Sequence, residues 1–244
     1  MRIQQAHLHF VIRMPRIARC VAPGAAHHIT QRGTARQLVF RTRTDRLVYL
    51  DLLREQAGFA DVSVLAYCLM PNHIHVIAVP PEEDSLAILL RRVYGRFAQY
   101  FNARRARCGH LWQNRFYSCP MGPSHLWTAI RYVESNPMRA GLAEQPVDYE
   151  WSSAEAHFSG HDRRRLLDME FFRRSGGVEN WRQLFGMPEP EAEYRRLRQS
   201  THAGQPLGDE SFRESVRFQQ QARKAPGAEG TSHPHEEART LAAC

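Results

Sequence analysis

The sequence lacks three features that would each assign it to a definite class of protein. No apolar run approaches the roughly 18–20 residues that a membrane-spanning helix needs. The first residues contain neither a long apolar stretch nor a small-residue cleavage site, so no secretory signal is indicated and a cytoplasmic location is expected. The five cysteines are scattered and form no C-x-x-C pair, so neither a zinc knuckle nor a disulfide framework is predicted.

Lysine is almost absent, because every cationic residue except Lys224 is an arginine. The net charge of +8 is unevenly distributed along the chain. Residues 1–142 carry 19 Arg against 8 Asp and Glu, a net charge of +11, whereas residues 143–244 have a net charge of −3. A polyanionic partner is therefore expected for the first part of the chain. Arginine suits bidentate contact with phosphate, although a GC-rich genome produces the same preference.

Apolar periodicity and turn residues predict strands and helices in a definite order. Strands are expected at His27–Thr30, Val62–Met70, His73–Val79 and Leu111–Met121, and helices at Arg46–Phe59 and Leu86–Phe101. One more helix is expected from an N-cap at Ser124 to Pro137. The order β-α-β-β-α-β is that of the ferredoxin-like α+β fold, an antiparallel sheet with two helices on one face. The additional helix is placed to bring side chains to the centre of the sheet.

The composition also predicts how the chain is divided. Met14 looks like a natural beginning, so residues 1–13 are interpreted as an N-terminal extension. Residues 14–153 are expected to form the main domain and residues 154–218 a helical C-terminal extension. The segment 219–244 has few large apolar residues and is predicted to be a disordered tail.

His73 and His75 are the first pair of residues that suggest chemistry. Alternate residues of a strand point to the same side, so both imidazoles are expected on one face while Ile74 and Val76 enter the core. Two imidazoles spaced in this way are able to bind one metal ion. A single His-x-His pair is nevertheless common, and a purely structural role is the alternative.

Tyr132 and Asn136 form the second pair, because residues four apart share one face of a helix. A helical tyrosine is ordinarily a packing residue with its hydroxyl at the rim of the core. Asn136 precedes Pro137, and a proline disfavours the helical conformation of the residue before it. The helix is therefore expected to end or kink at this point and to aim Asn136 by that kink.

Together these segments resemble a known family. The His-x-His pair followed by Tyr-x-x-x-Asn-Pro resembles the HUH single-tyrosine transposases, and most closely the REP-associated tyrosine transposases of bacteria. The resemblance covers about residues 14–153. Its segments are MPRIARCVAPGAAHHITQRG, LAYCLMPNHIHVIAVP, GHLWQNRFYS, IRYVESNPMRAGL and YEWSS.

The resemblance implies an RRM-like sheet, a Mg²⁺ or Mn²⁺ site and a tyrosine that attacks a DNA phosphodiester. It places His73 and His75 on the two metal-binding histidines, Tyr132 on the nucleophile and Asn136 on a third metal ligand. The implied product is a 5′-phosphotyrosine with a free 3′-hydroxyl, formed on single-stranded DNA beside a REP-like hairpin. Two alternatives stay open: a hairpin DNA- or RNA-binding module that does not cut, and a nickase of the replication-initiator or relaxase type. A monomer and a homodimer are both compatible with the sequence.

The segment from Gly109 to Tyr117 combines aromatic and basic residues. As a strand it would place Trp112 and Phe116 on one face, where they are expected to fill the core, and Arg115 on the other, where it is expected to contact DNA. Further arginines are candidates for the phosphate-binding surface. They are Arg16, Arg19, Arg32, Arg36, Arg91, Arg92, Arg96 and Arg139. His27 and His28 are assigned to the first strand without a chemical role.

Overall fold

The computed structural model describes residues 20–224. Its strands are β1 (Ala26–Arg32), β2 (Ser63–Met70), β3 (His73–Val79) and β4 (Tyr117–Met121). Its helices are α1 (Arg43–Phe59), α2 (Ser85–Ala103), α3 (Pro123–Arg139), α4 (Ala154–Ser159), α5 (Met169–Arg174), α6 (Gly177–Gly186), α7 (Glu191–Ala203) and α8 (Glu210–Lys224). Two short 3-10 turns, η1 (Thr34–Arg36) and η2 (Pro146–Asp148), complete the order of elements.

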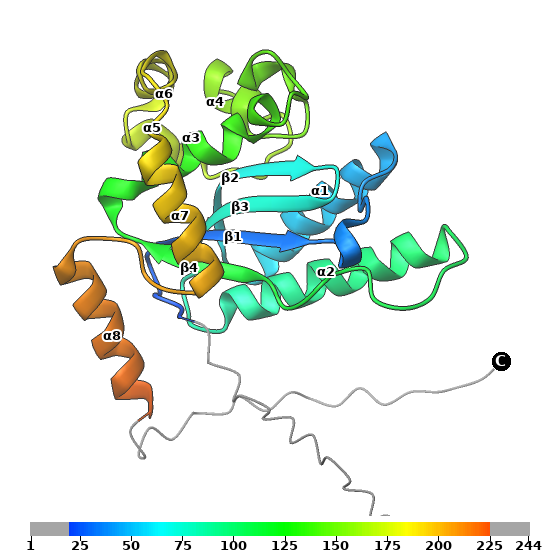
Figure 1. The fold of residues 1–244 in the computed structure, drawn as a ribbon, viewed down its shortest axis with the longest axis horizontal. Helices are drawn as coiled ribbons and strands as arrows, with labels where there is room; N and C mark the ends of the chain where they lie inside the picture. The colour runs from blue at the N-terminus through cyan, green and yellow to red at the C-terminus, as the bar shows by residue number, and fades with distance from the viewer. Residues whose placement is uncertain (1–19, 225–244) are drawn as a thin grey trace, which may run out of the picture.

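The strands form one sheet in the order β2-β3-β1-β4, and every neighbouring pair is antiparallel (Figure 1). The fold is therefore α+β, with the ferredoxin-like strand order that the sequence predicts. The additional helix α3 and the helical C-terminal segment are also present as predicted.

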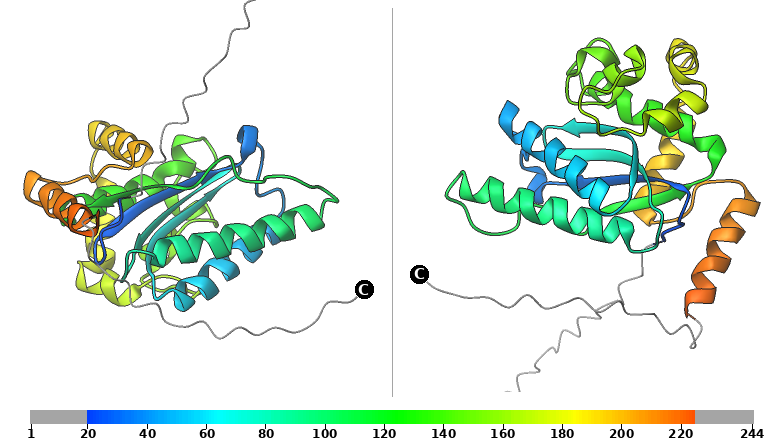
Figure 2. Two further views of the ribbon diagram at one scale, coloured as in Figure 1. Left: turned by 90° about the horizontal axis from the view of Figure 1, so that it is seen from below. Right: turned by 180° about the vertical axis from the view of Figure 1, so that it is seen from behind.

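Helices α1 and α2 pack side by side on one face of the sheet (Figure 2). The strand residues that point to this face, such as Ile29 and Val76, are fully buried beneath Leu53 of α1 and Phe97 of α2. Thr42 begins α1 as its N-cap: its hydroxyl accepts a hydrogen bond from the backbone N–H of residue 45 in a capping box. This face of the sheet is an apolar core.

Helices α3 and α7 cover the opposite face. Helix α3 lies over β2 and β3, α7 lies over β4 and β1, and the two helices contact each other. Apolar side chains such as Ile77, Cys119 and Ile130 fill part of the space beneath them. The remaining space beneath α3 and α7 is polar, and it contains the candidate site.

The predicted strand Leu111–Met121 is wrong in its first half, because β4 begins only at Tyr117. Residues 111–116 form a loop, in which Trp112 forms an isolated antiparallel bridge with Gly33, the residue that follows β1. The indole Nε1 of Trp112 donates to the backbone oxygen of Tyr94 (3.1 Å), which turns the ring toward α2 instead of along a strand. The expectation that Trp112 and Phe116 fill the core is confirmed.

Helix α3 differs from its prediction at both ends. Its N-cap is Gly122 and not Ser124, because Pro123 occupies the first helical position, where a missing N–H has no cost. The helix also continues through Pro137 to Arg139 instead of ending before the proline. Proline cannot donate to the carbonyl one turn earlier, and the side-chain amide of Asn136 donates to that oxygen, on Val133 (3.4 Å).

The C-terminal helices extend further than predicted. Helix α8 continues to Lys224, so the disordered tail was wrongly predicted for residues 219–224. The rest of that tail and the N-terminal extension, residues 1–13, lie outside the described residues, and the division at residue 153 stays a prediction. Among the helices of residues 20–224, none combines the length and apolar character that a bilayer crossing requires.

Candidate functional site

Polar side chains from β1, β3, α3 and α7 converge on a hollow of about 380 Å³ on the second face of the sheet. Strand alternation brings them together: His73 and His75 of β3 and His28 and Thr30 of β1 all point to this side. The residues that line the hollow are His28, Thr30, Gln31, Arg32, Arg36, His73, His75, Gln113, Tyr117, Tyr132, Asn136, Arg198, Thr201 and His202.

The two histidines of the His-x-His pair lie together in this hollow. The ring centroids of His73 and His75 are 5.0 Å apart, at an angle of 79°. Burial lowers the pKa of His73 to about 4 and holds the pKa of His75 well below its ordinary value, because a buried imidazolium loses its hydration. Both imidazoles are therefore neutral near pH 7, which is the state that binds a metal ion.

Tyr132 of α3 lies against these rings and is only 5% exposed. Its ring centroid is 5.6 Å from that of His75 and 5.7 Å from that of His28, and both contacts are edge to face. Tyr194 of α7 packs on it from another side, at 5.2 Å. The structure thus brings together the tyrosine and the histidine pair that the sequence singled out.

Arg198 of α7 is a charged residue close to the phenol. Its guanidinium carbon is 5.9 Å from the centre of the Tyr132 ring, and its Nη2 donates to Glu191 at 2.7 Å. Burial raises the pKa of the Tyr132 phenol, while the positive charge of Arg198 and its hydrogen bond to the phenol oppose that rise. Sequence reasoning missed Arg198, since it lies in no motif and far along the chain from Tyr132.

The side chain of Asn136 lines the hollow, but its amide nitrogen is already used in hydrogen bonds within α3. Its side-chain nitrogen donates to the backbone oxygens of Tyr132 (2.7 Å) and Val133 (3.4 Å). The carboxamide oxygen takes part in neither bond. A role as a metal ligand would use that oxygen, and it stays a prediction.

Glu134 anchors the opposite side of α3. Two residues along a helix correspond to a rotation of about 200°, so Glu134 points away from Tyr132. The carboxylate is fully buried and accepts from His157 Nδ1 (2.7 Å), from Trp181 Nε1 (2.6 Å) and from the Ser153 hydroxyl. These bonds tie α3 to α4 and α6 and so fix the helix that carries the tyrosine.

The hollow offers two imidazoles and one carboxamide as possible ligands of a divalent ion. Within residues 20–224, no three His, Cys, Asp or Glu side chains gather into a ligand set. Two neutral imidazoles and one amide oxygen nevertheless suit Mg²⁺ or Mn²⁺, because such ions keep water or phosphate oxygens in their remaining positions. The residues present therefore fit a metal ion that is completed by its substrate.

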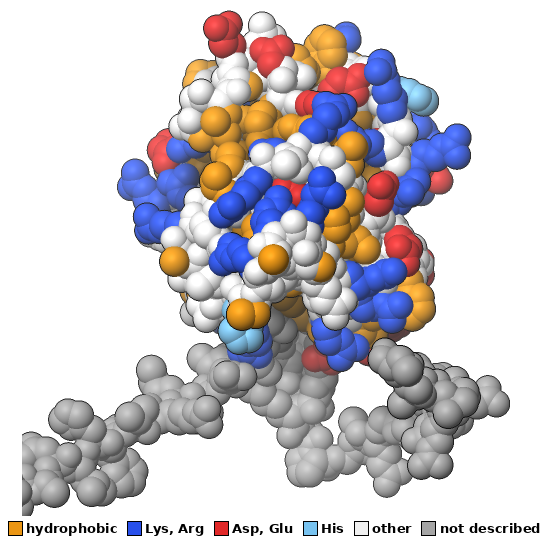
Figure 3. Space-filling view, turned by 90° about the vertical axis from the view of Figure 1, so that its right-hand side faces the viewer, with side chains coloured by type: hydrophobic (Ala, Val, Ile, Leu, Met, Phe, Trp, Pro, Cys, Tyr) orange, Lys and Arg blue, Asp and Glu red, His pale blue; other side chains and the backbone are white. Residues whose placement is uncertain are grey.

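The predicted phosphate-binding arginines fall into separate groups. Arg32 and Arg36 are exposed and line the hollow. Arg139 pairs with Glu189 (2.7 Å) and Glu191 (2.8 Å) beside it. In Figure 3, which views the side of the molecule at the right of Figure 1, Lys and Arg side chains gather in the middle of the surface, with acidic ones mostly toward its edges.

Other predicted arginines are not brought to the site. Arg92 and Arg96 lie on α2, beneath the opposite face of the sheet. There Arg96 pairs with Glu55 (2.7 Å) and Arg92 stacks over Phe59 (4.0 Å). Contacts with α1 account for both, so the structure gives them no link to the hollow. Arg91 lies on the same helix, Arg115 is exposed in the loop before β4, and Arg16 and Arg19 lie outside the described residues.

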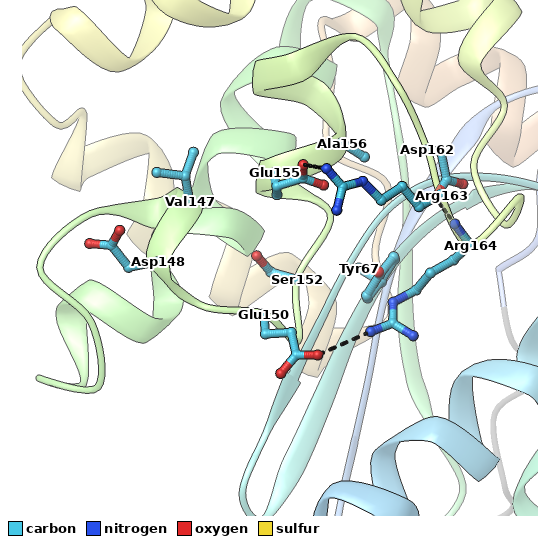
Figure 4. Close-up of a pocket in the computed structure, with 10 residues that line it drawn as sticks. All are labelled: Tyr67, Val147, Asp148, Glu150, Ser152, Glu155, Ala156, Asp162, Arg163 and Arg164. Atoms are coloured by element: carbon cyan, nitrogen blue, oxygen red, sulfur yellow. Dashed lines mark hydrogen bonds and ion pairs between the residues drawn. The ribbon is translucent and has the colours of Figure 1, made fainter.

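A second hollow, of about 460 Å³, lies between α4 and the edge of β2 (Figure 4). Arg164 pairs there with Glu150 (3.7 Å), and Arg163 lies 3.9 Å from Glu155. Its charged side chains pair mainly with each other, and none of its lining residues is a histidine or a cysteine. We therefore assign the candidate site to the hollow that contains the histidine pair.

Part of this chain is similar to proteins that are described as transposases. Residues 22–136 match the family model described as "Transposase IS200 like". A Haemophilus influenzae protein that carries the provisional name of REP-associated tyrosine transposase is 27% identical over 100 residues. That match covers 36% of this chain and 57% of the relative, so the chain spans little more than half of the relative's length.

One solved structure shows the same fold. It is titled as a REP-associated tyrosine transposase bound to a REP hairpin, and it superposes with a TM-score of 0.51 at 18% identity. The superposition covers 64% of this chain and 90% of the other.

Proposed function

We propose that the protein is a DNA strand transferase that cuts single-stranded DNA at REP-like hairpins, because residues 22–136 match the model of the IS200-like transposase family. Tyr132 is the proposed nucleophile. His73, His75 and the carboxamide oxygen of Asn136 are the proposed ligands of Mg²⁺ or Mn²⁺. The relative and the solved structure named above support the class of substrate, and the exposed Arg32 and Arg36 at the hollow are compatible with it.

One observation carries the proposal: the ring of Tyr132 lies 5.6 Å from that of His75, far away in the sequence, in a polar hollow that His73 also lines. A buried polar cluster is costly unless its groups are satisfied, so an apolar packing role alone gives no reason for it. The opposite face of the sheet, beneath α1 and α2, is filled with ordinary apolar residues, so this sheet does not need polar groups in order to pack.

The proposed reaction conserves the energy of the broken bond. The phenol oxygen of Tyr132 forms a bond to phosphorus, and the bond from phosphorus to the 3′ oxygen breaks. The phenol proton passes to solvent, and the 3′ oxygen leaves as a hydroxyl. In the reverse sense, a 3′-hydroxyl attacks the phosphotyrosine and releases the phenol, so strand transfer needs no ATP.

The residues around Tyr132 lower the barrier in separate ways. A phenol with a pKa of about 10 is a weak nucleophile until it is deprotonated or polarised. The guanidinium of Arg198 stabilises negative charge on the phenol oxygen. Arg32 and Arg36 would hold the anionic backbone of the strand at the mouth of the hollow. His73, His75 and Asn136 would hold a divalent ion, which would supply positive charge that stabilises the reacting phosphate.

The test is incubation with single-stranded DNA that carries a REP-like hairpin, with Mg²⁺ or Mn²⁺, followed by denaturing electrophoresis. We expect the wild type to give a band of covalently linked protein and DNA. The Tyr132→Phe variant should never give this band, although it should still bind the hairpin. Chelation of the metal should abolish the band in the wild type. Tyr194→Phe is the matched control, because it removes a neighbouring phenol of the same helix pair.

Cleavage by Tyr132→Phe would refute the assigned nucleophile. A second candidate function is favoured by one observation, the 5% exposure of Tyr132, which suits a protein that binds hairpins without cutting them. Binding with no covalent product from the wild type, at any metal concentration, would support that alternative.

A further inference from the structure

Each histidine of the pair uses one ring nitrogen in a hydrogen-bond chain that ends at a backbone carbonyl. A neutral imidazole carries its proton on Nδ1 or on Nε2, and only the other nitrogen can bind a metal ion. The direction of each chain therefore decides which nitrogen is available. A backbone carbonyl only accepts hydrogen bonds, so it fixes the direction of every bond that leads to it.

The first hydrogen-bond chain connects His75 to the backbone carbonyl of Leu197 in α7. The hydroxyl of Thr201 lies 2.7 Å from the backbone oxygen of Leu197 and must donate its single proton there. His28 Nδ1, 2.7 Å from the same hydroxyl oxygen, must then be the donor of that bond. The Nε2 of His28 is left as an acceptor, so the bond of 2.9 Å to His75 Nδ1 is donated by His75.

The geometry of these groups agrees with that order. The rings of His28 and His75 have their centroids 5.2 Å apart and 7° between their planes, which is compatible with a bond that lies in the plane of both rings. Thr201 and His28 are 1% exposed and His75 is 5% exposed, so water offers little competition. His28 is buried and its Nδ1 contacts a neutral hydroxyl, so these surroundings favour a ring with one proton and not two.

The second chain is shorter and ends at His73. The side-chain nitrogen of Asn72 donates to the backbone oxygen of Arg36 at 3.3 Å. That bond orients the amide so that its oxygen, 2.7 Å from His73 Nδ1, accepts from the imidazole. Nδ1 of His73 therefore carries the proton, as it does in His75.

We propose that Thr201, His28 and Asn72 are positioning residues, which hold both histidines in the Nδ1–H form and leave both Nε2 lone pairs available to one divalent cation. The inference rests on the proposed function in naming the cation. Groups that orient metal-binding histidines in this way commonly contribute 10–100-fold to metal affinity. Thr201 lies outside residues 22–136, so the C-terminal helices supply part of the site's chemistry.

The first test reads the tautomers without metal or DNA. Nitrogen NMR of ¹⁵N-histidine-labelled wild type near pH 7 should show Nδ1–H and bare Nε2 for His28, His73 and His75. Thr201→Val keeps the side-chain shape but removes the hydroxyl, so His28 and His75 should lose their single tautomer. Thr201→Ser should restore it, and Asn72→Leu should disturb His73 alone. Nε2–H signals for His75 in the wild type would overturn the inference.

Calorimetric titration with Mn²⁺ gives the second readout. Thr201→Val is expected to weaken binding by about 10–100-fold, and Thr201→Ser by much less. Thr128→Val is the matched control, because it makes the same change at the α3–α7 contact, where the hydroxyl bonds only to Glu193 (3.1 Å). Equal losses in Thr201→Val and Thr128→Val would overturn the positioning role.

The two proposals fail in different ways. If the wild type shows the expected tautomers and binds Mn²⁺ but never links to DNA, the strand-transfer function is wrong and the positioning role stands. If Tyr132 links to DNA while Thr201→Val leaves both the tautomers and the Mn²⁺ affinity unchanged, the function stands and the positioning role is wrong.

Discussion

The two faces of the sheet are built from the same strands but differ in what they bury. Beneath α1 and α2 the strands contribute Ile29, Ile74 and Val76, and the filling is apolar. Beneath α3 and α7 the alternate residues of the same strands, His28 and His75, are also buried but are polar. The comparison indicates that one face provides cohesion, whereas the interior of the other also contains the residues that we propose for catalysis. Substitutions on the two faces should therefore separate stability from activity.

Phe97→Ala should give the largest loss of stability. Phe97 is fully buried in α2 and packs against the rings of Phe40 and Tyr49 at 5.4 and 5.3 Å. Removing a buried phenyl ring leaves a cavity and typically costs about 3–5 kcal/mol. We expect that decrease in the free energy of unfolding, measured by urea denaturation, with unchanged Mn²⁺ affinity of the folded protein. A parallel loss of Mn²⁺ affinity would show that the two faces are not separable.

Asp45→Asn should give a smaller loss that depends on pH. Burial by itself would raise the pKa of the Asp45 carboxyl, but bonds from the Arg41 and Thr42 backbone N–H groups and from Arg105 (2.6 Å) hold it below its ordinary value. A lowered folded-state pKa stabilises the protein above the unfolded pKa, near 3.9, and that contribution is lost as the pH falls through the folded value.

The measurement for Asp45→Asn is the free energy of unfolding from pH 7 down to about pH 3. At pH 7 we expect a decrease of about 2 kcal/mol, since a buried carboxylate with charge-assisted bonds is replaced by a neutral amide. The gap between wild type and variant should close as the pH falls below about 4. A gap that stays constant with pH would show that the carboxylate charge contributes nothing. Hairpin cleavage at pH 7 should not change, because Asp45 lies on the α1–α2 face.

The strand and helix order was predictable because it depends on local signals. The apolar alternation around His73–Val79 and the helical spacing of Leu86–Phe101 are strong, and both elements appear as predicted within a few residues. The loop before β4 was mistaken for a strand because its aromatic residues mimic one. Only the tertiary bond from Trp112 to Tyr94 shows that the indole turns toward α2.

The site was predictable only where a motif marked it. His73, His75 and Tyr132 were singled out because each lies in a short pattern with a stated chemistry, and the structure brings them to one hollow, while their roles stay a prediction. His28, Arg198 and Thr201 were not found, since neither spacing nor composition shows that α7 folds back over β1 and β4. His28, Arg198 and Thr201 come into contact with the other residues of the hollow only when α3 and α7 pack on the second face of the sheet.

Arg198→Gln should have the smallest energetic effect of these substitutions, and that effect should be specific to the rate of cleavage. The substitution keeps a hydrogen-bond donor near Tyr132 but removes the charge that opposes the burial-raised pKa of the phenol. Charge-assisted bonds are roughly twice as strong as neutral ones, so we expect single-turnover cleavage to slow about tenfold, or about 1.4 kcal/mol.

The control for Arg198 comes from the same helix. Arg195→Gln removes an equal charge from an exposed position of α7, so a general loss of attraction for DNA would slow both variants alike. A slower rate for Arg198→Gln alone, with Mn²⁺ affinity and hairpin affinity intact, places the effect at the phenol. Arg198 belongs to α7 and pairs with Glu191 at the start of that helix. Such a result would therefore also show that α7 contributes to the cleavage reaction. Equal cleavage rates for Arg198→Gln and Arg195→Gln would show that Arg198 has no specific effect on the phenol, and the proposed catalytic residues would then lie only on the strands and α3.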